Sequence, residues 1–487
     1  MTSGYAARRM HISKGVILLL SCAAQFMVVL DVAIVNVALP SIQRDLGIGQ
    51  STLQWIVVAY GLMLGGFLLL GGRMADLVGR RRMLLTGLAL LSSASLLAGV
   101  AGSAGLLIGA RALQGFGAAM VAPAALSILA VTFAEGAERN RALGIYGAVT
   151  GISASAGVIA SGLLTAGPGW RWVFFINVPV DAILIAMAAT FLAADARDRR
   201  RSERFDIAGA VTVTSGLLLF VYALNRGTES GWGSGAALGL FAASVVMLCA
   251  FARIEARARS PLVPGSAVRN RTLVAANLSA FFTFGAVISF IFLGSLLMQQ
   301  VLGYSPTRTG VCWLATTVTS FVAAAITGTR LVAVAGGRRL LVAGFSLLAI
   351  SALLLTRVPA GGHFATDLLP ALLLAGVAGG LSAPAIQIGA LSGVARSMTG
   401  LASGLVETMR EIAGAIGVAA VSTVLVSRAG AAGSSARALG TPNAFHAAYW
   451  VIFAVAALGA LTAAIAFPWR ATRKTGPVRY RPATSRR

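Results

Sequence analysis

Two ionisable residues lie inside stretches of sequence that are otherwise apolar. Asp31 is the only charged residue between Gly15 and Pro40, and Arg111 lies in a second apolar run. A run of about 20 apolar residues can span the hydrocarbon core of a bilayer. A carboxylate or guanidinium in that region costs roughly 2.5–3.5 kcal/mol on insertion scales, so such a group faces a cavity or a partner of opposite charge.

Because burial favours the protonated form of a carboxyl group, we predict that Asp31 is a proton-coupling residue and that it also contacts a bound small molecule. Arg111 lies about two turns into its run, at a depth comparable to that of Asp31. Gln114 follows three residues later on the same helix face, and we predict that it also contacts this molecule. The alternative for both charges is a structural ion pair between neighbouring helices.

A third apolar stretch carries a cluster of charges, formed by Glu407, Arg410 and Glu411. At about 100° per residue the three side chains share one helix face. Two carboxylates against one arginine leave one negative charge, which predicts proton coupling and binding of a cation at Glu407 and Glu411. We expect Glu411 to be the partner of Arg410, because the two are adjacent, and Glu407 to matter more for cations. The alternative is a cluster that neutralises itself.

The composition indicates a membrane protein with many spans. The chain has 487 residues, of which 57% are hydrophobic and 11% charged, whereas a soluble domain would carry about a quarter charged residues. No cleavable signal peptide is evident. The net charge of +24 does not indicate nucleic-acid binding, because the basic residues gather in loops on one side of the predicted spans. The three cysteines and three histidines are scattered, so we expect no metal site.

The apolar runs predict fourteen spans. They cover residues 15–39, 51–71, 83–103, 106–130, 142–165, 174–194, 207–226, 234–253, 274–301, 310–330, 340–357, 367–391, 401–427 and 446–468. The amino terminus, the loops after even-numbered spans and the carboxyl tail hold 30 of the 39 basic residues. Since positive residues stay inside, both termini are expected in the cytoplasm.

An internal repeat divides the chain. Residues 73–87 (RMADLVGRRRMLLTG) align without gaps to residues 330–344 (RLVAVAGGRRLLVAG), and six of these fifteen positions are identical. We therefore expect two six-helix halves with two inserted helices. The predicted divisions are a cytoplasmic amino terminus (1–14), an N-terminal bundle (15–194), a basic linker (195–206), the inserted helices (207–253), a second linker (254–273), a C-terminal bundle (274–468) and a basic tail (469–487).

Several motifs together resemble one family. Residues 72–82 (GRMADLVGRRR) and 111–119 (RALQGFGAA) resemble the loop 2–3 and fourth-helix signatures of the major facilitator superfamily. Residues 30–40 (LDVAIVNVALP), 170–179 (WRWVFFINVP) and 300–306 (QVLGYSP), and Arg410 with two following glycines, resemble its fourteen-span drug:proton antiporter branch. This resemblance covers residues 15–468 and implies an all-α polytopic membrane protein of the major facilitator fold.

The resemblance also implies roles for particular residues. Gly72, Asp76, Gly79 and Arg80 are expected to form a cytoplasmic latch that holds an outward-facing state, and Arg111 is expected near the proton pathway. For the arginines of the latch loop, a simple anchoring role at the membrane surface stays open. The second copy of the repeat has Ala333 at the aspartate position, so the latch would be one-sided.

The fifth span departs from the family pattern. The antiporter branch has a Gly-Pro pair followed by Gly-Gly, whereas this chain has Gly157-Val158 and Ser161-Gly162. The proline kink is therefore missing. Small residues, Gly157 and Gly162 among them, are still expected to mark a packed structural interface, as is Arg410 in span 13.

The function predicted by these features is proton-driven efflux of amphipathic or cationic drugs across the cytoplasmic membrane. We expect no enzymatic activity and no cofactor other than the proton gradient. The expected partners are a small molecule, such as a lipophilic cation or antibiotic, and membrane lipid, with no nucleic acid and a monomeric state. Two alternatives stay open: a symporter or facilitator for a metabolite in the same fold, and a non-transporting membrane sensor or lipid-handling scaffold.

Overall fold

The computed structural model describes residues 2–193, 206–258, 261–359, 361–430 and 442–467, and these segments form helices joined by short turns. The predicted basic tail (469–487) and nearly all of the predicted linker (195–206) lie outside the described residues. Helices are the expected solution for apolar runs of this length, because in lipid each backbone polar group needs a partner within its own segment.

The first part of the chain forms the N-terminal bundle. Its helices are α1 (Thr2–Leu46), α2 (Gln50–Val78), α3 (Arg80–Gly99), α4 (Ala104–Thr132), α5 (Ala137–Ala166), the short α6 (Trp172–Phe175) and α7 (Asn177–Phe191). The inserted pair follows as α8 (Ile207–Ser230) and α9 (Gly235–Glu255). Each of these helices overlaps a span expected from the sequence, although α1 begins well before the predicted residue 15.

The second part of the chain forms the C-terminal bundle, which the short α10 (Gly265–Arg269) precedes. Its helices are α11 (Arg271–Leu296), α12 (Pro306–Ile326), α13 (Val332–Leu355), α14 (Leu369–Leu391), α15 (Thr399–Gly430) and α17 (Pro442–Ala466). Short π-helical turns extend α11 to Val301, join α12 to α13 through Leu331 and precede α14 from Phe364.

Twelve helical segments of the described residues are long and apolar enough to cross a membrane. One of them, Arg308–Leu355, holds 48 residues and is interrupted at Gly336, where the backbone has φ 75° and ψ 156°. Gly336 aligns with Gly79 in the internal repeat, and Gly79 has φ 116° where α2 meets α3. Both copies of the repeat therefore contain, at the same position, a glycine with a positive φ, a conformation in which an L residue would be strained.

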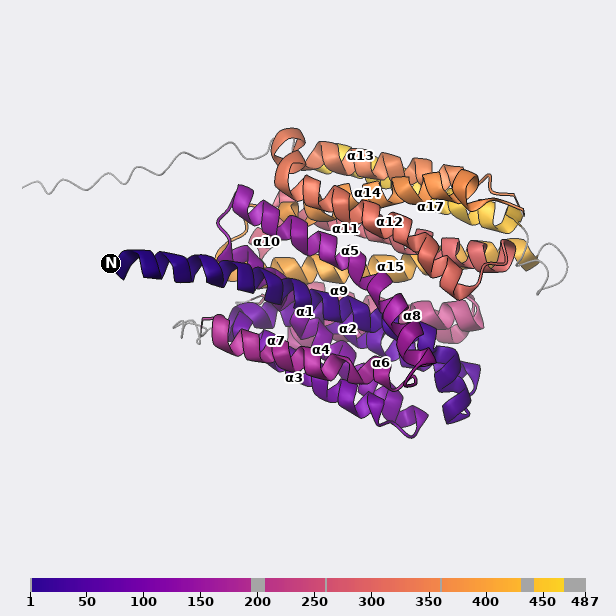
Figure 1. Cartoon of the computed structure of the whole chain (residues 1–487), viewed down its shortest axis with the longest axis horizontal. Helices are drawn as coiled ribbons and strands as arrows, with labels where there is room; N and C mark the ends of the chain where they lie inside the picture. The colour runs from indigo at the N-terminus through magenta and orange to yellow at the C-terminus, as the bar shows by residue number, and fades with distance from the viewer. Residues whose placement is uncertain (1, 194–205, 259–260, 360, 431–441, 468–487) are drawn as a thin grey trace, which may run out of the picture.

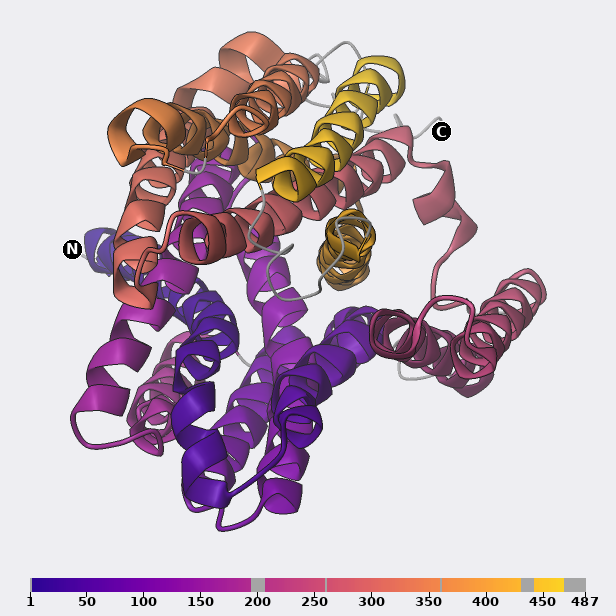
Figure 2. The same ribbon diagram turned by 90° about the vertical axis from the view of Figure 1, so that its right-hand side faces the viewer.

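The two bundles lie side by side, and the α8–α9 pair packs at their flank (Figures 1 and 2). Leu218 of α8 fits against Gly66 of α2, and Trp232 donates a hydrogen bond to Thr423 of α15 at 2.8 Å between Nε1 and Oγ1. The inserted pair thus contacts both bundles at their shared edge.

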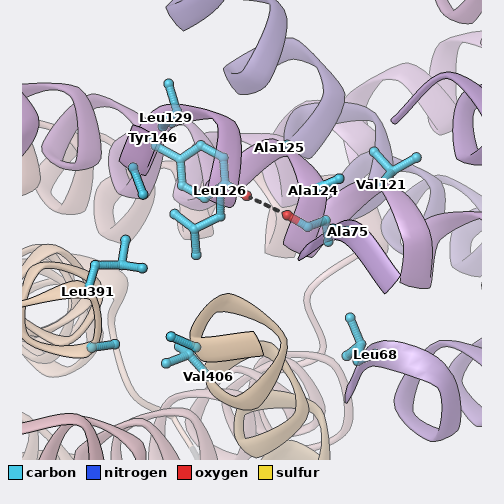
Figure 3. Packing of buried hydrophobic residues seen from close by; sticks show 14 of the residues in the cluster. Leu68, Ala75, Val121, Ala124, Ala125, Leu126, Leu129, Tyr146, Leu391 and Val406 are labelled. Carbon is cyan, nitrogen blue, oxygen red and sulfur yellow. Dashed lines mark hydrogen bonds between the residues drawn. The ribbon is translucent and has the colours of Figure 1, made fainter. Parts of the chain in front are cut away.

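The bundles share a hydrophobic core at one end only. The largest cluster of buried residues joins α2, α4 and α5 to α14 and α15, and Figure 3 shows Leu68, Leu126 and Tyr146 facing Leu391 and Val406. The two other clusters each lie within one bundle. The molecule is therefore closed at the end where the core is continuous, which we call the latch end, and its bundles have separate cores at the opposite end.

The opposite end has its own polar contacts within the N-terminal bundle. Arg171 donates to Asp45 at 2.7 Å between Nη1 and Oδ2, and Trp170 donates to the same oxygen at 3.1 Å. Hydrogen bonds from these two residues hold the pKa of Asp45 below its ordinary value. A lowered pKa means that this contact persists as the pH falls, until the pH passes the pKa of the folded state.

Candidate functional site

Asp31 lies at the centre of a fully buried polar network in the N-terminal bundle. Arg111 on α4 donates to Asp31 at 2.6 Å between Nη1 and Oδ2, and both side chains are at most 1% exposed. The other carboxylate oxygen, Oδ1, accepts from Gln114 Nε2 at 3.1 Å and from Asn177 Nδ2 at 2.7 Å. The network thus joins α1, α4 and α7.

Neighbouring groups hold the guanidinium in place. Arg111 Nε donates to the backbone carbonyl of Ile56 at 3.1 Å, and the guanidinium carbon lies 4.2 Å from the centre of the Tyr60 ring. A Cβ atom on Gly115 would overlap the carbonyl oxygen of Tyr60, so glycine permits the close approach of α4 to α2. This approach brings the cation–π contact within reach.

The network can respond to a proton. Protonation of Asp31 removes the charge that pairs with Arg111 and leaves the guanidinium buried without a counter-ion, which is costly in a low-dielectric site. The comparable depth predicted for Asp31 and Arg111 agrees with their direct contact. In this state the predicted substrate contacts of Asp31 and Gln114 are closed off, since both side chains are 0% exposed.

The charge cluster on α15 lies between the two bundles. Arg410 Nη2 lies 2.9 Å from Glu407 Oε2 and 3.2 Å from Glu411 Oε1, so one guanidinium pairs with both carboxylates. The expected pairing of Arg410 with Glu411 is present, with hydrogen bonds from Nε and Nη2 to Oε1 at 3.4 and 3.2 Å, and Glu407 is a second ionic partner that the sequence did not predict. Glu407 lies about one turn before Arg410 on the same helix face, so its carboxylate is within reach of the guanidinium.

The two carboxylates differ in their surroundings. Glu407 is 1% exposed and interacts electrostatically with Tyr146 of the N-terminal bundle. The Glu411 side chain is 30% exposed, and its Cβ lies 3.9 Å from where a Cβ on Gly65 of α2 would stand. Both acids therefore lie at the interface of the bundles, and Glu411 is the one that a ligand can reach in this state.

The latch residues join α2 to the start of α15. The Asp76 carboxylate accepts hydrogen bonds from the backbone N–H groups of Gly400 at 3.0 Å and Leu401 at 2.9 Å. Arg80 Nη2 donates to Asp76 at 3.0 Å. A carboxylate at a helix N-terminus is stabilised by the helix dipole and by the free N–H groups of the first turn. Asp76 therefore contacts both the N-terminus of α15 and an arginine of its own bundle.

Arg80 extends this contact across the bundle interface. Its Nε donates to Ser127 Oγ at 2.6 Å, and its Nη2 donates to Thr399 Oγ1 at 3.1 Å and to the carbonyl of Arg396. Gly72 lies directly against α15, because a Cβ there would overlap the carbonyl oxygen of Gly400. An anchoring role alone does not account for these contacts of Arg80.

The two glycines singled out on α5 differ. A Cβ on Gly157 would lie 2.8 Å from Ala33 Cβ of α1, so Gly157 does mark a close helix contact. Gly162 is exposed, and a Cβ there would meet nothing within 4 Å. The predicted interface at Gly162 is wrong, because this residue lies on the outward face of the helix.

Sequence reasoning missed one buried acid beside the network. Asp181 on α7 is 0% exposed and lies one turn after Asn177. It is a charged residue inside an apolar run, so the rule that singled out Asp31 would have found it. Ser95, which accepts from Gln114 Nε2 at 2.7 Å, was also missed, and a lone serine in a helix gives no such signal.

An apolar cavity of about 350 Å³ lies beside this network, between α1, α5 and the α6–α7 segment. Its lining consists of Leu19, Cys22, Ala23, Phe26, Met27, Leu30, Val149, Ile176 and Val180. The cavity offers space for an apolar group but no charged or polar side chain to orient it.

Comparison with known proteins places these features in context. Residues 21–418 match the Major Facilitator Superfamily. The chain is 39% identical over 411 residues to the puromycin resistance protein pur8 of Streptomyces alboniger, covering 82% of this chain and 80% of the relative. It is 36% identical over 423 residues to the cephamycin export protein CmcT of Amycolatopsis lactamdurans, covering 86% of each.

A solved structure has a similar fold. The human organic anion transporter MFSD10 (TETRAN) superposes with a TM-score of 0.65 at 15% sequence identity, covering 94% of this chain and 99% of that chain. At this level of identity the similarity concerns the fold alone.

Proposed function

The chain belongs to the Major Facilitator Superfamily, and from this membership we propose that it exports antibiotics or related drugs from the cell in exchange for protons. It is a membrane transporter and not an enzyme. The names of its relatives support export: pur8 is a puromycin resistance protein and CmcT a cephamycin export protein, and both match most of this chain.

The buried pair of Asp31 and Arg111 carries the proposal of proton coupling. The two charges are 2.6 Å apart and at most 1% exposed, so uptake of one proton by Asp31 removes an ion pair between α1 and α4. Such a change can bias the equilibrium between two arrangements of the bundles, provided that the proton binds one arrangement more tightly than the other.

The cluster on α15 supports a preference for cations. Its two carboxylates face one guanidinium at the interface of the bundles, which leaves one negative charge. A lipophilic cation bound there would gain an interaction on the order of a few kcal/mol at an effective dielectric near 20. The same cation would compete with a proton for the carboxylate, and this competition is the simplest mechanism of antiport.

The proposed topology has fourteen spans in the cytoplasmic membrane, with the latch end and both termini in the cytoplasm. The count takes α12 and α13 as two spans separated at Gly336, and α5, with 30 residues, as another. The distribution of basic residues supports the orientation. A monomer surrounded by lipid is the proposed assembly. Cysteines at Arg200, outside the described residues, and at Gly361 should react from opposite sides, and reaction from one side would contradict this topology.

Transport in inverted membrane vesicles tests the function, with puromycin as the probe. If protons drive export, puromycin accumulates in vesicles whose lumen is acidified, and an uncoupler collapses the accumulation. Asp31→Asn should abolish the accumulation while leaving protein abundance unchanged. A symporter would instead move a substrate outward with the protons.

The matched control is Asp45→Asn, which makes the same chemical change at an acid that is 45% exposed. It should transport like the wild type. Full gradient-driven accumulation by Asp31→Asn would exclude Asp31 as the coupling residue. Absence of flux for a panel of antibiotics, with folded wild-type protein, would favour a sensor or scaffold.

A further inference from the structure

Asp181 on α7 is a buried carboxylate. The residue is 0% exposed, and neither Oδ1 nor Oδ2 has a partner among the described residues. Buried carboxylates are ordinarily paired with a cation or hydrogen bonded, because an isolated ionised carboxylate in a low-dielectric interior is very costly. The simplest way to avoid this cost is for Asp181 to hold a proton.

The position of Asp181 connects it to the Asp31 network. Asn177 lies one turn earlier on α7 and donates its Nδ2 to Asp31 Oδ1 at 2.7 Å, while no residue in the described part of the chain pairs with its own Oδ1. Asp181 interacts electrostatically with Asp31. On the surrounding elements, α1 contributes Asp31, α4 contributes Arg111, and α3 contributes the uncharged Ser95 to this network.

The charges of this group do not balance when both acids are ionised. Arg111 is the single cation of the network, and it is committed to Asp31. One guanidinium can neutralise one carboxylate. The group is therefore neutral when Asp31 is ionised and Asp181 protonated, or when Asp31 is protonated and Asp181 ionised. Like charges in one buried site do not ionise together, because each disfavours the charged form of the other.

We propose that Asp181 is a second proton-binding site of the transporter, protonated while Asp31 is paired with Arg111. Uptake of a proton by Asp31 frees Arg111 to neutralise a second carboxylate, and Asp181 then releases its proton. The group returns to its starting state when Asp31 releases its proton and Asp181 takes one up. This inference rests on the proposed proton-coupled export, and it assigns a further residue to that coupling.

Infrared spectroscopy of the purified protein in lipid nanodiscs tests the proposal without any substrate. A protonated carboxyl group has a C=O stretch that an ionised carboxylate lacks. At neutral pH the wild type should show this band, Asp181→Asn should lose it, and Asp45→Asn should keep it. An unchanged band in Asp181→Asn would overturn the proposal.

A pH titration separates exchange from a permanently neutral acid. The Asp181 band should disappear as the pH rises, and in Asp31→Asn it should disappear at a pH lower by roughly one to three units, because the neighbouring negative charge is gone and Arg111 is free. A band that persists at every pH, or a midpoint unchanged by Asp31→Asn, would reduce Asp181 to a structural acid. If Asp181→Asn does not fold, Asp181→Glu should keep a protonated band at a shifted frequency.

A transport measurement then shows whether the proton is used. With puromycin as the probe, inverted vesicles that carry Asp181→Asn should release fewer protons to the medium for each puromycin taken up than wild-type vesicles do, because Asp181 no longer releases a proton when Asp31 takes one up. If puromycin is neither bound nor moved, the proposed function fails for this probe, whereas the infrared titration still decides the protonation of Asp181. Equal proton release by the wild type and Asp181→Asn would contradict a role in coupling.

Discussion

At the scale of single residues, Asp31 and Arg111 depend on each other more than either depends on its surroundings. Each is buried and charged, and each has the other as its counter-ion at 2.6 Å. Removal of one partner from a buried pair typically costs about 3–5 kcal/mol, because the remaining charge is left uncompensated. Removal of both charges avoids most of that penalty.

A double-mutant cycle on this pair tests their coupling. We expect Arg111→Gln to lower the free energy of unfolding by about 3–5 kcal/mol and the double variant Asp31→Asn/Arg111→Gln to lower it by less than the sum of the single changes. Unfolding in detergent micelles, followed by tryptophan fluorescence, measures the differences. Additive losses would mean that the two charges do not stabilise each other.

The acids on α15 lead to a prediction about ligand charge. Because Arg410 pairs with both Glu407 and Glu411, each acid contributes to the single excess negative charge. Glu407→Gln and Glu411→Gln should both weaken the binding of a cationic drug, by roughly tenfold or about 1.4 kcal/mol, and affect a neutral analogue of the same shape much less. Equilibrium binding of the two ligands measures this selectivity. Equal losses for both would indicate a purely structural ion cluster.

At the scale of helices, glycine determines how closely α4 approaches α2. Gly115→Ala would place a methyl group on the carbonyl of Tyr60 and should destabilise the protein by about 1–3 kcal/mol. Gly162→Ala on α5 is the control, since its Cβ meets nothing within 4 Å and alanine favours a helix. Melting temperatures of the two variants in the same detergent measure the difference. Equal stability of both would mean that α4 and α2 separate at little cost.

The inserted helices give a further test at this scale. Thr214 on α8 is 7% exposed, and its Oγ1 has no partner among the described residues. Residues 207–225 contain no charged residue that could couple a proton or bind an ion. We expect Thr214→Ala to leave antibiotic export in vesicles nearly unchanged. A loss of export with normal expression would place α8 at the transport pathway. Leu218 of α8 packs against Gly66 of α2, so a change in α8 could reach the N-terminal bundle through this contact.

The helices themselves were predictable from the sequence, because an apolar run of membrane length has few alternatives to a helix. The pairing of side chains was harder to foresee. Arg111 was expected at a depth comparable to that of Asp31, but nothing in the sequence fixes which helices are neighbours. The roles of Asn177 and Ser95 in this network, and the exposure of Gly162, depend on that arrangement and so emerged only with the structure.

At the scale of the whole molecule, the bundles are joined at one end and separate at the other. The shared core and the contact of Asp76 with the first turn of α15 lie at the latch end. Alternating access requires each of its two states to be closed at one end, and the shared core closes this state at the latch end. The transition to the other state must break the latch, so the latch contacts set part of the free-energy difference between the states.

Gly72 is a position where this difference can be changed by a single methyl group. A Cβ there would overlap the Gly400 carbonyl of α15, so Gly72→Ala should push the bundles apart at the latch end. Gly61→Ala is the control on the same helix, because a Cβ on Gly61 meets nothing within 4 Å. Asp76→Asn should act in the same direction as Gly72→Ala, since it removes the charge that the N-terminus of α15 stabilises, an interaction of about 0.3–1 kcal/mol and up to about 2 when partly buried.

Spin labels can follow this opening. Cysteines at Val78 and Ser397, in a background without the three native cysteines, place one label on each side of the latch. In Gly72→Ala and Asp76→Asn the distribution of distances between the labels should shift to longer values, whereas Gly61→Ala should match the wild type. A wild-type distribution in Gly72→Ala would show that the contact of α2 with α15 does not hold the closed end together. If the shift is present, gradient-driven export should fall with it, because a state that no longer closes at the latch end cannot complete the cycle.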